Sequence, residues 1–174
     1  MARYIVDSQI DNHEKYYFIR EQESQDIVLL PSKYLMHKKR SKLSPNTIRR
    51  SAGAISYYLN YIDETGIQLD DVWEMPYDKQ QEHFTDYLIW LQAGLHSGDS
   101  YKKKPYNETC NAYLKEVFRF YRFSGQQDES TKQLKVLSDM RIIVHNSVGV
   151  KRTLYRNTSV SYTHLRAHET RRHL

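Results

Sequence analysis

Basic side chains are concentrated in one short stretch of this sequence. Seven Lys and Arg residues and no acid lie between positions 33 and 50: Lys33, Lys38, Lys39, Arg40, Lys42, Arg49 and Arg50. From Tyr61 to Leu95 the balance reverses to eight acids and one base. Segregated charge of this kind predicts a basic face opposite an acidic one. A dense basic block that leads into a helix favours phosphate binding, with ordinary solvated surface charge as the alternative.

Residues arranged for catalysis or metal binding are few. Cys110 is the only cysteine, which excludes an internal disulfide and a cysteine-based zinc site and fits a reducing, cytoplasmic environment. His168 and Glu169 precede His173, but the two histidines are five residues apart rather than the four of a zinc helix. Phosphate-loop and nucleophile-elbow motifs are also missing. We therefore expect no catalytic residue, no metal and no cofactor.

The composition fits one folded domain without a membrane segment. Of 174 residues, 39% are hydrophobic and 27% are charged, with a net charge of +5. These values are typical of a folded domain of ordinary size. Every apolar run is shorter than the roughly 20 residues of a membrane span, and the N-terminus lacks the apolar core of a signal peptide. We expect a cytoplasmic protein without membrane contact.

Apolar periodicity predicts a mainly α-helical fold, a small four-helix bundle. Ser44 and Pro45 begin the first strong helix, and Gly66 ends it. Further helices are expected over about residues 78–93, 107–123 and 130–139. The expected buried positions are Ile48, Ala52, Ile55, Leu59 and Ile62 on the first helix, Phe84, Tyr87, Leu88, Trp90, Leu91 and Leu95 on the second, Cys110, Leu114, Val117, Phe118 and Tyr121 on the third, and Leu134 and Leu137 on the fourth.

The two ends of the chain lack a helical period. Residues 1–32 contain three pieces rich in β-branched and aromatic residues, and they predict a short extended or β segment: 3–6, 16–19 and 26–30. Residues 142–156 are expected to form a basic linker. Residues 160–170 resemble the translation of a transposon-based sequencing adapter. We therefore expect residues 160–174 to be a non-native tail.

Two segments carry a resemblance to a known family. Residues 43–62 begin Leu-Ser-Pro-Asn-Thr-Ile and are similar to the opening helix of the core-binding domain of tyrosine-type site-specific recombinases, the phage and transposon integrases. The matching positions are Thr47, Leu59 and either Tyr61 or Ile62. Residues 107–121 resemble the last long helix of that domain, with Leu114, Phe118 and Tyr121 in its Leu-x-x-x-Phe-x-x-Tyr pattern. Residues 134–152 resemble the connector that follows it. Together these pieces cover roughly residues 27–156.

The resemblance implies a SAM-like core-binding domain over residues 33–140, a linker over 141–159, and a catalytic domain absent from this chain. It implies duplex DNA as the partner and tetramer assembly on DNA, although this fragment alone is expected to be monomeric. The first and third helices would direct their N-termini at DNA, where backbone N–H groups favour phosphate. The implied contacts are Lys38, Lys39, Arg40, Lys42, Thr47, Arg49, Arg50, Lys102, Lys103, Lys104, Tyr106, Asn107 and Asn111.

A second interpretation stays open. The chain could be a stand-alone helical module that binds DNA or protein and has no enzymatic role. The two interpretations differ in the genomic reading frame beyond Ser159. A recombinase requires a continuing frame that encodes a Tyr nucleophile and its Arg, Lys and His partners, whereas a stand-alone module requires a stop codon.

Overall fold

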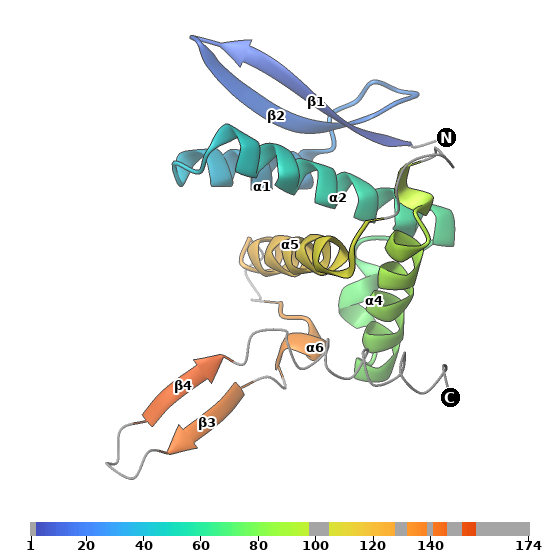
Figure 1. Cartoon of the computed structure of the whole chain (residues 1–174), viewed down its shortest axis with the longest axis vertical. Helices are drawn as coiled ribbons and strands as arrows, with labels where there is room; N and C mark the ends of the chain where they lie inside the picture. The colour runs from blue at the N-terminus through green and yellow to red at the C-terminus, as the bar shows by residue number, and fades with distance from the viewer. Residues whose placement is uncertain (1–2, 98–104, 128–131, 139–140, 146–150, 156–174) are drawn as a thin grey trace.

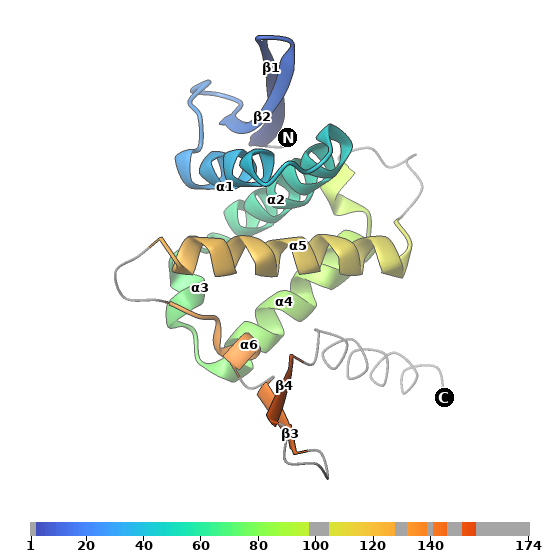
Figure 2. The same cartoon turned by 90° about the vertical axis from the view of Figure 1, so that its left-hand side faces the viewer.

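The computed structural model describes residues 3–97, 105–127, 132–138, 141–145 and 151–155. In this part of the chain the fold is mainly helical with a two-stranded antiparallel sheet at the N-terminus, which confirms the expected class. The elements are β1 (Tyr4–Asp11), β2 (Glu14–Glu21), α1 (Leu29–Arg40), α2 (Pro45–Thr65), α3 (Asp71–Glu74), α4 (Tyr77–Gln92), η1 (Leu95–Ser97), α5 (Asn107–Gly125), α6 (Lys135–Ser138), β3 (Arg141–His145) and β4 (Lys151–Tyr155). Figures 1 and 2 show the N-terminal hairpin over α1 and α2, with α5 beneath α2 and crossing α4.

The N-terminal hairpin is longer than the two extended pieces that the sequence predicts there. Its strands pair from Tyr4 with Glu21 to Asp11 with Glu14. Asn12 and His13 form the turn with φ of 48° and 63°. Two consecutive positive φ values are typical of the type I′ turn, whose twist matches that of the paired strands. Tyr17 and Ile19 of β2 are buried against the helices.

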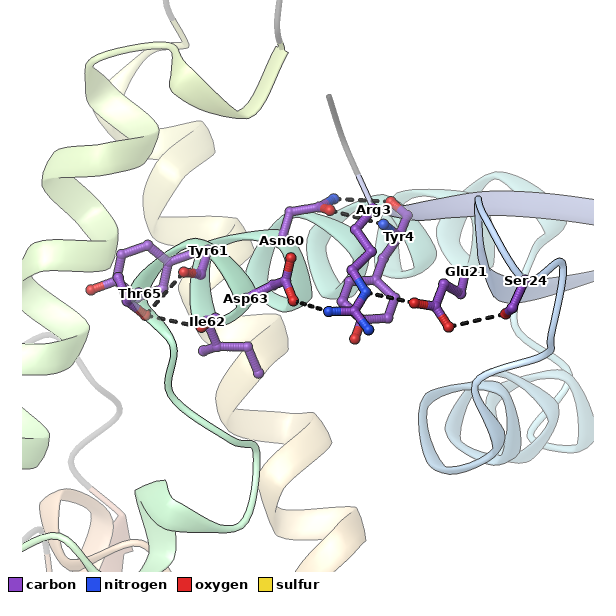
Figure 3. Close-up of polar contacts among 9 residues, drawn as sticks. All are labelled: Arg3, Tyr4, Glu21, Ser24, Asn60, Tyr61, Ile62, Asp63 and Thr65. Atoms are coloured by element: carbon purple, nitrogen blue, oxygen red, sulfur yellow. Dashed lines mark hydrogen bonds and ion pairs between the residues drawn. The ribbon is translucent and has the colours of Figure 1, made fainter.

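The hairpin is fixed to α2 by one buried amide and one exposed guanidinium (Figure 3). The Asn60 amide accepts a hydrogen bond from the Tyr4 N–H and donates one to the Tyr4 carbonyl, both at 2.9 Å. Arg3 bridges Glu21 of β2 and Asp63 of α2. A buried amide with matched donors and acceptors fixes a register because a shifted chain would leave it unsatisfied. The hairpin is therefore an integral part of the fold.

Helix α1 is the main departure from the predicted elements. Residues 26–30 are not a third strand, because only Ile27 forms a bridge, with Arg20, and α1 begins at Leu29. Pro31 lies in the first turn of α1, where its missing N–H disrupts no helical hydrogen bond. Tyr34 and Leu35 are buried against the rest of the core. The helical part of the fold thus begins a few residues before the predicted position 33.

Helix α2 forms as the sequence predicts. The Ser44 Oγ accepts a hydrogen bond from the Thr47 N–H at 3.2 Å, and Pro45 occupies the first turn. Gly66 ends the helix with φ of 70°, a left-handed conformation that favours glycine. All five predicted core positions of this helix are buried.

Helices α4 and α5 lie within one or two residues of their predicted bounds. Every expected buried position on them is buried except Leu95, which is 59% exposed. Leu95 follows Gly94, whose φ of 81° turns the chain out of α4, so the helical stripe does not continue to it. Cys110 is buried, as expected of a small core residue.

Inside the core, the polar groups of Tyr58, Tyr121 and His83 form a hydrogen-bonded cluster. The Tyr58 hydroxyl lies 2.8 Å from the Tyr121 hydroxyl and 2.9 Å from His83 Nε2. Burial lowers the pKa of His83 to about 4, so the ring is neutral at pH 7. Tyr121 also donates to the Leu69 carbonyl at 3.2 Å. Several of the fifteen tyrosines are therefore core residues with satisfied hydroxyl groups.

The C-terminal segments differ from the prediction in two respects. The helix expected over residues 130–139 is described only over Lys135–Ser138, with Leu134 buried just before it and Leu137 partly buried. The predicted linker contains two antiparallel strands, β3 and β4, which pair Arg141 with Tyr155 and His145 with Lys151. The lack of helical periodicity in residues 142–156 predicts an irregular linker, but short paired strands lack that periodicity as well. Residues 160–174 lie outside the described part of the chain.

Candidate nucleic-acid interface

The corner between α1 and α2 gathers basic groups around a helix N-terminus. The last turn of α1 contains His37, Lys38, Lys39 and Arg40, and the first turn of α2 contains no acid. Lys42 lies between the helices in a left-handed conformation with φ of 57°. Basic residues at a helix C-terminus complement its dipole, and the following helix adds a positive N-terminus beside them. The corner thus brings basic side chains and the positive N-terminus of a helix together.

The backbone donors of this N-terminus are mostly used within the protein. Pro45 has no N–H, the Thr47 N–H is capped by Ser44, and the Ile48 N–H donates to the Ser44 carbonyl at 3.1 Å. Within the described residues, the Asn46 N–H is the first-turn donor that has no protein acceptor. An approaching phosphate would therefore find one backbone donor here and would depend mainly on side chains.

Five of the predicted contact residues are exposed around this corner: Arg40, Lys42, Thr47, Arg49 and Arg50. Among the residues that the structure describes, none of the four cations forms an ion pair. Thr47 Oγ1 lies 2.8 Å from Ser44 Oγ, so its hydroxyl is part of the helix cap. In the described part of the chain, these four cations therefore have no ion-pair partner that would compete with a phosphate.

Lys38 does not belong to this exposed set, which corrects its expected role as a DNA contact. It is 8% exposed, its ammonium pairs with Glu116 of α5, and it donates to Ser51 Oγ at 2.8 Å. Tyr34 also donates to Glu116, at 2.6 Å. Burial alone would raise the pKa of Glu116, but the hydrogen bonds from Lys38 and Tyr34 and the charge of Lys38 lower it overall. The helical spacing from Tyr34 and Leu35 places Lys38 on the inner face of α1.

Lys39 is only partly available for the DNA contact that the sequence predicts. Its ammonium pairs with Glu14 of β2 at 3.1 Å and lies 5.1 Å from the centroid of the Tyr16 ring. Its side chain is 22% exposed. The hairpin therefore competes for this cation, although an exposed ion pair of this kind is weak and exchanges partners easily.

The second predicted cluster precedes and opens α5. Tyr106 is 67% exposed and holds the position before the helix, and Asn107 is exposed. The Asn107 Oδ1 accepts a hydrogen bond from Gln92 Nε2 at 3.2 Å, which joins the ends of α4 and α5. Asn111 is partly buried. Lys102, Lys103 and Lys104 lie outside the described residues.

An aromatic wall of three side chains, which were not among the predicted site residues, joins α2 to α5 and η1. The Tyr57 ring of α2 packs edge-on against Tyr113 of α5 at 5.4 Å and against His96 of η1 at 4.8 Å. Burial raises the pKa of Tyr113, and the nearby charge of Arg50 opposes that rise. The helical spacing of Arg50 and Tyr57 could have indicated that both residues share one exposed face.

The described residues contain no further site of a common type. No group of three or more His, Cys, Asp or Glu side chains in this part of the chain is arranged to hold a metal ion. No described helix combines the length and apolar character needed to cross a bilayer. The histidines of the tail, residues 164, 168 and 173, fall outside the described ranges.

Comparison with known proteins gives no relative. No protein-family model matches the sequence, and no curated protein or solved structure matches it either.

Proposed function

We propose that this chain binds duplex DNA through the α1–α2 corner and the adjoining exposed face of α2 and α5. One observation carries the proposal: Arg49 and Arg50 are exposed at the start of α2, a few residues after the exposed Arg40 and Lys42, and none of the four has an ion-pair partner among the described residues. Unpaired cations on one rigid corner suit a polyanion better than a single small anion, because DNA presents phosphates at regular spacing. The segregation of acids to the region from Asp63 to Asp86 supports the same orientation.

Each group has a distinct part in the proposed complex. Arg49 and Arg50 would contact successive phosphates, and the Asn46 N–H would add one backbone hydrogen bond. Arg40 and Lys42 would extend the contact along the same strand. Asn107 and Tyr106, at the start of α5, would approach the neighbouring groove or backbone. Lys38 has no part in this contact because its charge is neutralised inside the protein.

We further propose that the chain is the core-binding part of a tyrosine-type recombinase. The resemblance of residues 43–62 and 107–121 supports this assignment. The two helices that carry it, α2 and α5, pack against each other. In this proposal α1, α2, α4 and α5 form the four-helix core-binding unit. A catalytic domain beyond the linker would supply the chemistry of integration or excision, in the cytoplasm, within a tetramer on DNA.

Two experiments test the two parts separately. Fluorescence anisotropy of the full chain with a short DNA duplex, repeated over a salt series, should give a log–log slope of magnitude about 4 or more. Affinity independent of salt would contradict DNA binding. Sequencing of the genomic reading frame past Ser159 should show a continuing frame with the Tyr, Arg, Lys and His residues of the family. A stop codon there would contradict the recombinase assignment and favour a stand-alone module.

A further inference from the structure

The exposed stripe of α2 is narrow and has an unusual composition. From Ile48 to Ile62 every residue is buried except Arg49, Arg50, Gly53 and Tyr57. The hairpin, α1, α4 and α5 cover the remaining faces of this helix. These four residues are thus all that this part of α2 offers to a partner. Two of them are cations, one is aromatic, and one has no side chain.

Nothing in the described part of the chain requires residue 53 to be glycine. It lies in the middle of a 21-residue helix, where glycine is the least favourable residue after proline. Unlike Gly66 and Gly94, it is not among the residues of positive φ. A Cβ built at Gly53 would meet no described atom within 4 Å, whereas one at Gly125 would lie 2.0 Å from the Lys132 carbonyl oxygen. Neither the backbone conformation nor packing against the described residues therefore requires glycine here.

The surroundings of Gly53 point to a close external contact. Arg49 and Arg50 lie one turn before it on the same face, and Tyr57 lies one turn after it. Tyr57 is held by Tyr113 and His96, so the aromatic side of the stripe is fixed. Partly exposed helix backbone at Gly53 therefore lies between a pair of exposed cations and an aromatic wall.

From this arrangement we infer that Gly53 is the point of closest approach between α2 and a DNA strand, where the sugar-phosphate backbone contacts the helix main chain. The inference rests on the proposed DNA binding and deepens it. Glycine permits the close approach of a ligand to the backbone because no Cβ intervenes. At that distance Arg49 and Arg50 reach the flanking phosphates, and the Tyr57 ring packs against the sugar. The complementary charge of Arg49 and Arg50 identifies the occupant as a polyanion.

The test is a size series at position 53, measured for both stability and binding in the full chain. Gly53→Ala should raise the thermal midpoint by roughly 2–4 °C, because alanine has the higher helix propensity. The same variant should weaken binding to a short DNA duplex about tenfold, and Gly53→Val should weaken it further. The salt dependence should keep the wild-type slope, since no cation is lost. Thr85→Ala on α4, also a neutral change to alanine within a helix, should leave DNA affinity unchanged.

The outcomes separate this inference from DNA binding itself. Suppose that Gly53→Ala and Gly53→Val bind DNA as tightly as the wild type, while Arg49→Ala weakens binding and lowers the salt slope. The inference of a close approach at Gly53 is then wrong, whereas the proposed DNA binding is supported. If the wild-type chain shows no salt-dependent binding to duplex DNA, both fail. A more stable Gly53→Ala protein with weaker binding and an unchanged salt slope supports the inference.

Discussion

The ammonium of Lys38 on α1 lies against the carboxylate of Glu116 on α5, inside the protein. This pair removes one cation from a block of seven that looks uniform in sequence. It also joins α1 to α5, with Tyr34 and Ser51 as further hydrogen-bond partners. The basic block therefore has two roles. Lys38 stabilises the corner, and its exposed neighbours form the proposed DNA surface.

Removal of one partner of this pair should destabilise the fold without weakening DNA binding. Lys38→Met leaves the buried Glu116 carboxylate without its main counter-charge, which costs about 3 kcal/mol in the free energy of unfolding. The double variant Lys38→Met/Glu116→Leu should recover most of that loss, because no buried charge remains. Urea unfolding measures both. Unchanged stability together with weaker DNA binding in Lys38→Met would show that Lys38 is a surface cation after all.

His83 should make stability fall as the solution becomes acidic. Its pKa is lowered by burial to about 4 in the folded state, against 6.5 as the ordinary value. As the pH falls, His83 therefore binds a proton at a higher pH in the unfolded chain than in the folded chain. The stabilising contribution is complete above pH 6.5 and is lost as the pH falls through 4, in total about 3 kcal/mol.

The matched comparison is His83→Gln against His37→Gln, which changes an exposed histidine. Between pH 6.5 and 4 the His83→Gln protein should show a smaller loss of unfolding free energy than the wild type, in urea titrations at each pH. The His37→Gln protein should follow the wild type. A wild-type pH dependence in His83→Gln would contradict a buried neutral imidazole.

Gly125→Ala should be strongly destabilising, in contrast to the same change at Gly53. The new Cβ would lie 2.0 Å from the Lys132 carbonyl oxygen and 2.9 Å from Trp73 Cη2. A backbone carbonyl cannot rotate away as a side chain can, so the segment before α6 must move, at a cost of about 3 kcal/mol. Thermal unfolding of the two variants should give midpoint shifts of opposite sign. A Gly125→Ala protein as stable as the wild type would mean that residue 132 does not pack against α5.

Much of the helical core was predictable, because its signals are local. Ser44, Pro45 and Gly66 mark both ends of α2, and apolar spacing identifies the buried faces of α4 and α5. The exposed cations Arg49 and Arg50 follow from the same periodicity. These features depend on neighbouring residues within one helix and need no tertiary information.

The remaining features depend on contacts between distant residues. Helix α1 has no side-chain cap and no regular apolar stripe, and packing against β2, α2 and α5 stabilises it. Its buried Lys38 looks like surface charge until Glu116, far along the chain, is brought beside it. The hairpin turn uses Asn12 and His13 rather than the usual Asn-Gly, so its signal is hidden. The aromatic wall of Tyr57, His96 and Tyr113 likewise joins three separate elements.

The salt dependence of duplex binding by Arg49→Ala/Arg50→Ala tests the central claim most directly. Loss of two phosphate contacts should weaken binding roughly 50-fold near 0.1 M salt and reduce the magnitude of the log–log salt slope by about 2. Lys79→Ala removes an exposed cation from the acidic face, where it pairs with Glu82, and should leave both quantities near wild type. Wild-type affinity and slope in Arg49→Ala/Arg50→Ala, with folding intact, would contradict the assignment of this surface to DNA.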